Sequence, residues 1–408
     1  MKIEKDILLK RFLQYVKFDT QSNPLSETCP SSPQQFAFAE MLAEELHRLG
    51  ATEISLDANG YVFATIPATT EKSNQIIGFI AHMDTSPDFC ASNIQPQIVE
   101  NYDGNDIVLN AEKDIVLRAS HFPEIKKYIG QTIVTTDGTT LLGADDKAGV
   151  AAIMCAAEYL LTHPEIPHGI IRIGFTPDEE IGRGANLFDV QKFSADYAFT
   201  IDGGEIGELE YENFNAAEVF IAITGNCIHP GYAKGKMINA LNVAHEFHAS
   251  LPANERPETT DEREGFFHLT KLEGSEESAV IHYIIREFDR ENFENRKAQI
   301  EKIAQSINEK YSSPVIAIKL SDQYYNMYEK IAPHKSIIEK AEKAILESGI
   351  KPLIRAARGG TDGARLSYMG LPCPNIFCGV HNMHGKYEFV PAESMQKAAE
   401  VILRIATI

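Results

Sequence analysis

Apolar and polar positions follow a helical period at the start of the chain. Residues 4–17 and 31–49 repeat apolar side chains at intervals of three and four, which predicts two amphipathic helices. Residues 52–66 alternate instead, and they contain Asn59-Gly60, a pair that favours a tight turn. We therefore expect two helices followed by a β-hairpin.

Short apolar runs then alternate with a long apolar helix. Residues 148–161 are apolar on nearly all sides and predict a buried helix, whereas residues 84–128 are rich in Pro, Asn and Asp and predict a long excursion. Buried strands are expected at 76–81, 133–135, 170–175 and 197–201. This alternation is typical of an α/β fold whose sheet carries helices on its faces.

The pattern changes after Asp202. The next elements are expected to be a strand, a helix, two strands, a helix and a strand, at 218–224, 237–250, 266–272, 280–288, 291–309 and 315–320. This βαββαβ order is the ferredoxin-like pattern. Helix and strand alternation then resumes, with a strand at 375–380 and a closing helix at 392–405. We therefore predict an α/β protein in which residues 1–208 and 322–408 form a mixed-sheet, three-layer domain and residues 209–321 form an inserted domain.

Composition indicates the compartment in which the protein works and the classes of partner that it does not bind. The chain has 408 residues, more than one hydrophobic core usually holds, and its formal net charge of −20 excludes nucleic acid and anionic membranes as partners. The six cysteines include no Cys-x-x-Cys pair, which indicates a reducing compartment. The N-terminus is charged, and the longest apolar run, 150–161, is too short to span a bilayer. We expect a soluble cytoplasmic protein.

Acidic and imidazole side chains stand beside several of the predicted strands. They are His82 and Asp84 after 76–81, Asp145 and Asp146 before the helix 148–161, Glu179 and Glu180 after 170–175, Asp202 after 197–201, and His384 after 375–380. In open α/β sheets, ligand sites form at the carboxyl ends of the strands. These side chains are therefore expected to meet at one edge of the sheet.

Each of these residues also has an ordinary explanation. Asp145 and Asp146 are good helix caps, Asp202 before two glycines is a common turn former, and His82 alone would usually be a hydrogen-bonded histidine. The ordinary explanations are independent, however, and all of them would have to hold together. Gathering so many acidic and imidazole groups without a cation costs several kcal/mol in repulsion and desolvation. A metal centre is the better explanation.

The ligand types indicate which metal. Imidazole and carboxylate without thiolate suit Zn²⁺, with Mn²⁺ or Co²⁺ as substitutes. Two histidines and three carboxylates are more than one catalytic zinc takes, so we expect two ions that share one carboxylate. Asp145, in its Gly-Ala-Asp-Asp turn, is the best bridge. His82 and Asp202 would complete one ion, and Glu180 and His384 the other.

Two carboxylates remain for other roles. Asp84 lies two residues after His82, so both point the same way in an extended chain, and Asp84 can hold the far ring nitrogen of that histidine. Glu179 lies next to the ligand Glu180 and is placed to accept the proton of an attacking water and pass it to a leaving amine. The set as a whole predicts amide hydrolysis.

The motifs together resemble the two-zinc aminoacylase and carboxypeptidase family of metallopeptidases. The strings that carry the resemblance, in this order, are His82-Met-Asp, Gly143-Ala-Asp-Asp-Lys-Ala-Gly, Thr176-Pro-Asp-Glu-Glu-Ile-Gly-Arg-Gly-Ala, Asp202-Gly-Gly and His384-Gly-Lys-Tyr-Glu-Phe. Further matching strings begin at Phe18, His229, His282 and Arg358, so the resemblance covers essentially the whole chain. Within the family, the chain looks like the members that release the N-terminal residue of tripeptides.

The resemblance implies the same ligand and acid–base roles, and it adds others. It implies that residues 1–208 and 322–408 form the catalytic domain and that the insertion is a lid or dimerisation-type domain carrying His229 and Arg286 to the substrate. It also implies a cis peptide bond between Asp145 and Asp146. A homodimer is left open.

The chain departs from the family pattern at two positions. Arg365 stands where an uncharged Gln is expected, and Cys227 stands where Asn is usual. Neither position belongs to the predicted metal ligands.

Three functions remain as alternatives. The first is an aminopeptidase acting on short peptides, chiefly tripeptides. The second is a carboxypeptidase or N-acyl amino acid deacylase, which would use the same metal residues but read a substrate carboxylate through an arginine such as Arg286, Arg358 or Arg365. The third is a metal-dependent binding protein without turnover, against which the presence of both Asp84 and Glu179 argues.

Overall fold

The computed structural model describes residues 1–71 and 75–407, and it divides into two compact units. The first comprises Met1–Tyr211, Glu329–Arg355 and Thr361–Ile408, and the second comprises Glu212–Tyr328 and Ala356–Gly360. The expected division at residues 208/209 and 321/322 stays a prediction about where folded domains begin and end.

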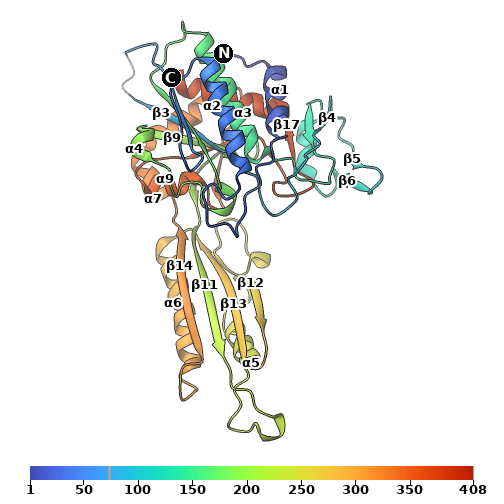
Figure 1. Cartoon of the computed structure of the whole chain (residues 1–408), viewed down its shortest axis with the longest axis vertical. Coiled ribbons are helices and arrows are strands. Elements are labelled where there is room, and N and C mark those ends of the chain that lie inside the picture. Colours follow the sequence, from blue (N-terminus) through green and yellow to red (C-terminus); the bar gives the residue numbers. More distant parts are fainter. Residues whose placement is uncertain (72–74, 408) are drawn as a thin grey trace. The chain divides into compact units, whose positions relative to one another are not determined.

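The first unit is built on a mixed eight-stranded sheet (Figure 1). Its strands, in sheet order, are β1 (Thr52–Leu56), β2 (Val62–Ile66), β8 (Ile171–Thr176), β3 (Ile77–His82), β9 (Tyr197–Gly203), β16 (Asn375–Phe377), β10 (Glu208–Asn213) and β15 (Leu353–Ala357). The central strands β8, β3, β9 and β16 run parallel to one another. In contrast, β1 pairs antiparallel with β2, β2 with β8, and β10 with β16. The parallel strands therefore end at one edge of the sheet.

Helices cover both faces of this sheet. They are α1 (Lys5–Tyr15), α2 (Gln34–Leu49), α3 (Ala144–Thr162), α4 (Val190–Phe193), α8 (Lys335–Glu347), α9 (Asp362–Tyr368) and α10 (Ala392–Thr407), with α7 (Tyr328–Ile331) and the 3₁₀ helices η1 (Pro123–Tyr128), η2 (Glu179–Ile181) and η5 (Ala332–His334) between them. In β3, Phe79 packs into the core that α1, α2, α3, α8 and α10 share, whereas its neighbour Ile80 packs towards α4 and α9. The expected three-layer architecture is confirmed.

Two small sheets contain the strands of the excursion after β3. A three-stranded sheet has the order β17 (Phe389–Pro391), β7 (Ile133–Thr135) and β4 (Gln97–Val99), and β5 (Ile107–Asn110) pairs with β6 (Ile115–Leu117). Antiparallel pairing of β17 with β7 fixes the end of the loop that carries His384.

The second unit has the expected βαββαβ order. Its elements are β11 (Asn215–Thr224), η3 (Pro230–Tyr232), α5 (Ala240–Ala249), η4 (Pro257–Thr259), β12 (Phe266–Gly274), β13 (Ser278–Glu287), α6 (Arg290–Asn308) and β14 (Ile316–Tyr324). The four strands lie side by side in the order β12-β13-β11-β14, and α5 and α6 pack on the sheet (Figure 1). In β11, alternate residues such as Val219 and Ile221 fill the core between sheet and helices, while Phe220 is exposed.

Several of the described strands were not expected from the sequence: β4, β5 and β6 within the excursion, and β10, β15 and β17 outside it. β17 ends in Pro391, and proline is unfavourable in strands because it lacks a backbone N–H. It is tolerated here because β17 is the edge strand of its sheet. Within the described residues, none of the helices combines the length and the apolar character that crossing a membrane requires.

Candidate metal centre

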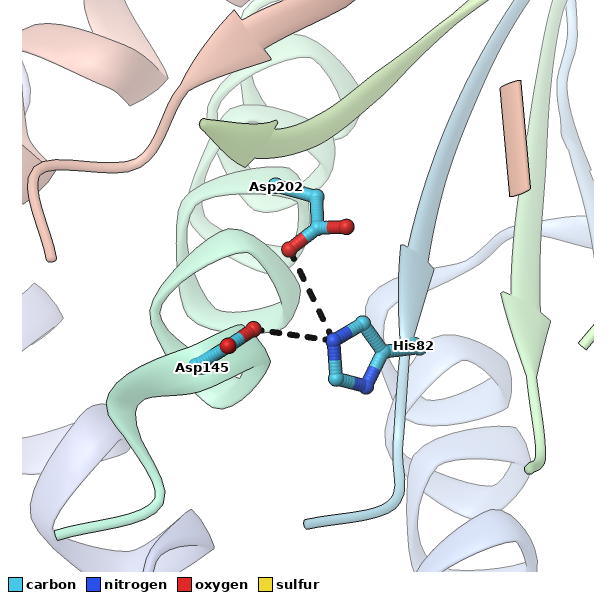
Figure 2. A group of neighbouring side chains, drawn as sticks. All are labelled: His82, Asp145 and Asp202. Atoms are coloured by element: carbon cyan, nitrogen blue, oxygen red, sulfur yellow. Dashed lines mark hydrogen bonds and ion pairs between the residues drawn. The ribbon is translucent and has the colours of Figure 1, made fainter. Parts of the chain in front are cut away.

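The first group of candidate ligands meets at the edge where the parallel strands end. His82 is the last residue of β3, Asp202 lies near the end of β9, and Asp145 lies in the first turn of α3 (Figure 2). The Nε2 atom of His82 lies 3.0 Å from Oδ1 of Asp145 and 3.6 Å from Oδ1 of Asp202. Three potential ligand atoms thus surround one point.

The second group lies on the other side of Asp145. Glu180 belongs to η2, which follows β8, and His384 lies in the loop between β16 and β17 with a left-handed φ of 63°. Nε2 of His384 lies 2.8 Å from Oε2 of Glu180 and 3.2 Å from Oδ2 of Asp145. The ligand atoms within each group lie within 4.8 Å of one another.

Asp145 is shared by both groups through different oxygens. Its Oδ1 faces His82, and its Oδ2 faces His384. The backbone at Asp145 is not helical (φ −81°, ψ 102°), although the residue stands at the start of α3, and its peptide bond to Asp146 is cis as expected. A carboxylate presented in this way can bridge two cations.

The pKa values of the cluster are those expected for a cation site that holds no cation. Burial raises the pKa of Glu180 to about 8 and that of Asp202 to about 6. Burial would lower the pKa of His82, but Asp202, Asp145 and Asp84 raise it well above its usual value. Hydrogen bonds to Asp145 and Glu180 raise the pKa of His384 to about 11. Without a metal, protons therefore balance the carboxylates.

One buried atom supports the same conclusion. Oε1 of Glu180 is inaccessible to solvent and has no hydrogen-bond partner within residues 1–71 and 75–407. A buried carboxylate oxygen without a donor is costly, and a cation satisfies it. The imidazole and carboxylate donor set fits divalent metal ions in both groups.

Asp84 connects the two glutamates to His82. Its carboxylate is fully buried, and it accepts hydrogen bonds from the backbone N–H groups of Glu179 at 2.9 Å and of Glu180 at 3.1 Å. The same carboxylate lies 3.3 Å from Nδ1 of His82. Asp84 therefore orients the histidine ring and fixes η2 at the same time. Its contacts hold Glu180 in a fixed position relative to His82.

Glu179 is half-buried beside these groups. Burial raises its pKa well above the usual value, and the nearby carboxylate of Asp202 acts in the same direction, while His82 opposes them. A glutamate in such a site can accept a proton at neutral pH and release it again. Its predicted acid–base role is compatible with this environment.

Three residues that orient the candidate ligands were given no role from the sequence. Asp88 lies 3.2 Å from Nδ1 of His384, so each histidine has a carboxylate on its far nitrogen. Asn375 accepts the backbone N–H of Asp202 through Oδ1 at 3.1 Å. The buried carboxylate of Glu388 accepts the backbone N–H of Asp145. Only Glu388, within the quoted His384 string, could have been found from a motif.

The two predicted substrate-binding residues belong to the second unit. His229 is exposed, and its Nδ1 accepts the backbone N–H of Gly231 at 3.1 Å. The other ring nitrogen, Nε2, takes no part in this hydrogen bond. Arg286 lies over the ring of Tyr324, 5.0 Å from its centroid, and burial lowers its pKa to about 10. Nη1 of Arg286 has no hydrogen-bond partner in the described part of the chain. Their roles stay predictions.

The sequence matches a family model described as "Peptidase family M20/M25/M40" over residues 136–407. It is 57% identical to peptidase T of Geobacillus sp. (strain WCH70) over 401 residues, with 98% of each chain covered. It is 55% identical to peptidase T of Clostridium novyi (strain NT) over 400 residues, again with 98% of each covered.

Solved structures share the fold. Aminopeptidase PepT from Bacillus cereus superposes with a TM-score of 0.80 at 24% identity, covering 99% of this chain and 98% of that one. A tripeptidase from Staphylococcus aureus also gives a TM-score of 0.80, at 20% identity, with 100% of this chain and 99% of that chain covered. A dinuclear metal-binding peptidase of the M20 family from Bacillus subtilis gives 0.66 at 14% identity, covering 99% and 97%.

Proposed function

The chain belongs to peptidase family M20/M25/M40, and from that membership we propose that it is a di-metal aminopeptidase that releases the N-terminal residue of tripeptides. One observation carries the proposal: the two oxygens of Asp145 face two separate groups of candidate ligands. The relatives of more than half identity bear the name peptidase T, and one structural neighbour is called a tripeptidase.

We propose that the ions are Zn²⁺, with Co²⁺ or Mn²⁺ as substitutes. His82, Asp145 and Asp202 would hold one ion, and Asp145, Glu180 and His384 the other. Divalent ions held there would polarise a peptide carbonyl and make a water acidic enough to attack it at neutral pH. The absence of thiolate from both groups is why we favour zinc with an imidazole and carboxylate shell.

The acid–base work falls to the chain itself. We assign Glu179 to accept the proton of the attacking water and to deliver it to the amine that leaves. Asp84, although buried beside it, is already engaged with two backbone N–H groups and His82, so we assign it to orientation. The raised pKa of Glu179 supports this division, because the proton must be held between the two transfers.

Substrate recognition is assigned to the second unit. We propose that His229 donates a hydrogen bond to the carbonyl oxygen as negative charge develops on it. Arg286 is proposed to bind the C-terminal carboxylate of the peptide, because a desolvated guanidinium with an unpartnered Nη1 among the described residues binds an anion well. In contrast, Arg358 donates to the carbonyl oxygen of Glu262, and Arg365 to that of Gly182.

A carboxypeptidase or N-acyl amino acid deacylase is the second candidate, because Arg286 would serve it equally well. The two candidates differ in the substrate end that must be free. We also propose a cytoplasmic enzyme of peptide breakdown that binds neither nucleic acid nor membranes, as its net charge of −20 indicates. A homodimer stays a prediction.

Turnover of three forms of one tripeptide separates the candidates. The aminopeptidase proposal expects the free peptide to be cleaved with release of its first residue, the N-acetylated peptide to resist cleavage, and the C-amidated peptide to be cleaved with a raised KM. A chelator should abolish all turnover. Faster cleavage of the N-acetylated form than of the free form would instead establish the second candidate.

A further inference from the structure

Glu388 stands at a junction of the first unit that the proposed roles do not use. It directly precedes β17 and is 1% exposed. Two backbone hydrogen bonds between His381 and Phe389, of 2.9 and 3.0 Å, close the loop that contains His384, and the N–H of Glu388 binds the carbonyl oxygen of Gly385 at 3.2 Å. Glu388 is therefore fixed to the segment that presents His384.

The side chain of Glu388 reaches a different segment, the turn before α3. Its Oε2 accepts the backbone N–H groups of Leu142 at 2.7 Å and of Gly143 at 2.9 Å. Its Oε1 accepts the backbone N–H of Asp145 at 3.0 Å. All three donors thus belong to the turn that presents Asp145.

A buried carboxylate is well suited to this task. In its ionised form it has only acceptor atoms, so it can satisfy the three N–H donors that converge on it. Hydrogen bonds to an ionised acceptor are stronger than bonds to a neutral one. The turn requires Gly143 in a left-handed conformation (φ 71°), and it departs from helical geometry again at Asp145. Such a turn has no helical hydrogen bonds of its own for these N–H groups, and Glu388 supplies their acceptors.

The geometry points to a positioning role for Glu388, and we propose that it sets the distance between the bridging Asp145 and His384. One of its contacts is with the backbone of Asp145 itself, and its own backbone belongs to the loop of His384. The 3.2 Å separation between Oδ2 of Asp145 and Nε2 of His384 thus depends on the connection that Glu388 makes between the two segments. Glu388 touches neither group of ligand atoms and acts only through the two segments that carry them.

This inference rests on the proposed function, because it concerns the metal centre. Its experiment compares Glu388→Gln with Glu393→Gln in the full-length protein. Glu393 is a matched control, because it accepts the backbone N–H of Thr132 at 2.9 Å and a bond from Lys5 at 2.9 Å, outside the candidate metal centre. In Glu388→Gln, an amide NH₂ faces an N–H donor of the turn, so at least one of the three bonds is lost.

The measurements are zinc dissociation constants by chelator competition, kcat and KM for a tripeptide, and urea unfolding of the metal-free proteins. We expect Glu388→Gln to raise at least one zinc dissociation constant about 10–100-fold, the usual effect of losing a partner that orients a ligand. Its kcat should fall while KM stays within about twofold, since substrate contacts are untouched. Glu393→Gln should keep the zinc affinity and kcat of the wild type.

Two results would overturn the inference: wild-type zinc affinity and kcat in Glu388→Gln, or an equal loss of zinc affinity in Glu393→Gln. If Glu388→Gln does not fold, Glu388→Asp, which keeps the charge but shortens the side chain, is judged by the same criteria. A wild-type protein that binds no zinc or cleaves no peptide would refute the proposed function instead, so the two failures are distinguishable.

Discussion

At the scale of single residues, the proposed chemistry depends on a separation of tasks between neighbouring carboxylates. Glu179 and Glu180 are adjacent in η2, yet Glu180 contacts His384, whereas Glu179 interacts electrostatically with His82 and Asp202. Asp84 holds the backbone of both. One glutamate can therefore bind a cation while the other moves a proton.

The first prediction tests this separation. Glu179→Gln should retain both metal ions and lose turnover by about 10²–10⁴-fold, the usual contribution of a general acid–base group. Metal analysis of the purified variant and its kcat give the two numbers. A variant that keeps near-normal turnover would mean that another group carries the proton, and a variant without metal would make Glu179 a ligand.

A second prediction concerns the two histidines. His82→Ala and His384→Ala should each retain about one ion where the wild type retains two, because each histidine belongs to only one ligand group. Metal content after gel filtration checks this. Loss of both ions in either variant would show that the groups do not fill independently, and retention of both would remove that histidine from the ligand set.

A third prediction concerns the pH dependence of stability. Burial lowers the pKa of His381 to about 4, and its Nε2 lies 2.7 Å from the hydroxyl of Tyr128. The unfolded chain therefore binds a proton more tightly than the folded one, so the stability that the neutral ring contributes is full above pH ~6.5 and is lost as the pH falls towards 4. The free energy of unfolding should decrease over this range.

His381→Gln supplies the control for that measurement. Urea unfolding of the metal-free proteins between pH 7 and pH 4 should show a weaker decrease for the variant than for the wild type. Parallel pH profiles for the two proteins would mean that His381 is not responsible.

The residue scale also shows what a sequence can reveal about such a site. The five candidate ligands could be predicted because each lies next to the end of a strand or the start of a helix and because imidazole and carboxylate together indicate a metal. Asp88 could not, since it is separated from His384 by 296 positions and only the fold brings the two together. Asn375 is hidden for the same reason: its contact with the backbone N–H of Asp202 leaves no pattern in the sequence.

At the scale of elements, the close packing of α3 against β9 places Asp145 and Asp202 at the same edge. Gly149 in α3 permits this approach, since a Cβ atom there would lie 2.0 Å from the carbonyl oxygen of Ile201 and 2.4 Å from Oδ1 of Asp146. Neither the backbone of β9 nor the buried Asp146 can move aside easily. The position of α3 thus depends on residue 149 being a glycine, which has no side chain.

A fourth prediction follows for this helix. Gly149→Ala should lower the free energy of unfolding by about 1–3 kcal/mol, the usual cost of overpacking a core, although alanine favours helices. Gly359→Ala is the matched control, because a Cβ atom there meets nothing within 4 Å. Urea unfolding of both variants decides it. Equal stability of Gly149→Ala and the wild type would contradict the packing described here.

Elements differ in how far their sequence predicts them. The helix α6 and the strands β11 and β13 have a clear period and were expected, as was the order of the second unit. β10 was missed because its sequence Glu-Leu-Glu-Tyr-Glu-Asn is acidic and resembles a loop, while β15 follows a proline at the sheet edge. Neighbouring strands stabilise these segments, and that information lies elsewhere in the chain.

At the scale of the whole molecule, the chain combines a sheet edge that gathers ligands with an inserted βαββαβ unit. The metal candidates all lie in the first unit, and the two residues proposed for substrate recognition lie in the second. Removing metal is therefore expected to abolish turnover without unfolding the second unit, whose core is built from its own elements.

The most direct test of the central claim is to add Zn²⁺ stepwise to metal-free protein and to measure release of the N-terminal residue from a free tripeptide. We expect no turnover without metal and a rise that reaches its plateau at two equivalents per chain, because there are two groups of candidate ligands. Full turnover without metal, or a plateau at a single equivalent, would contradict the di-metal centre.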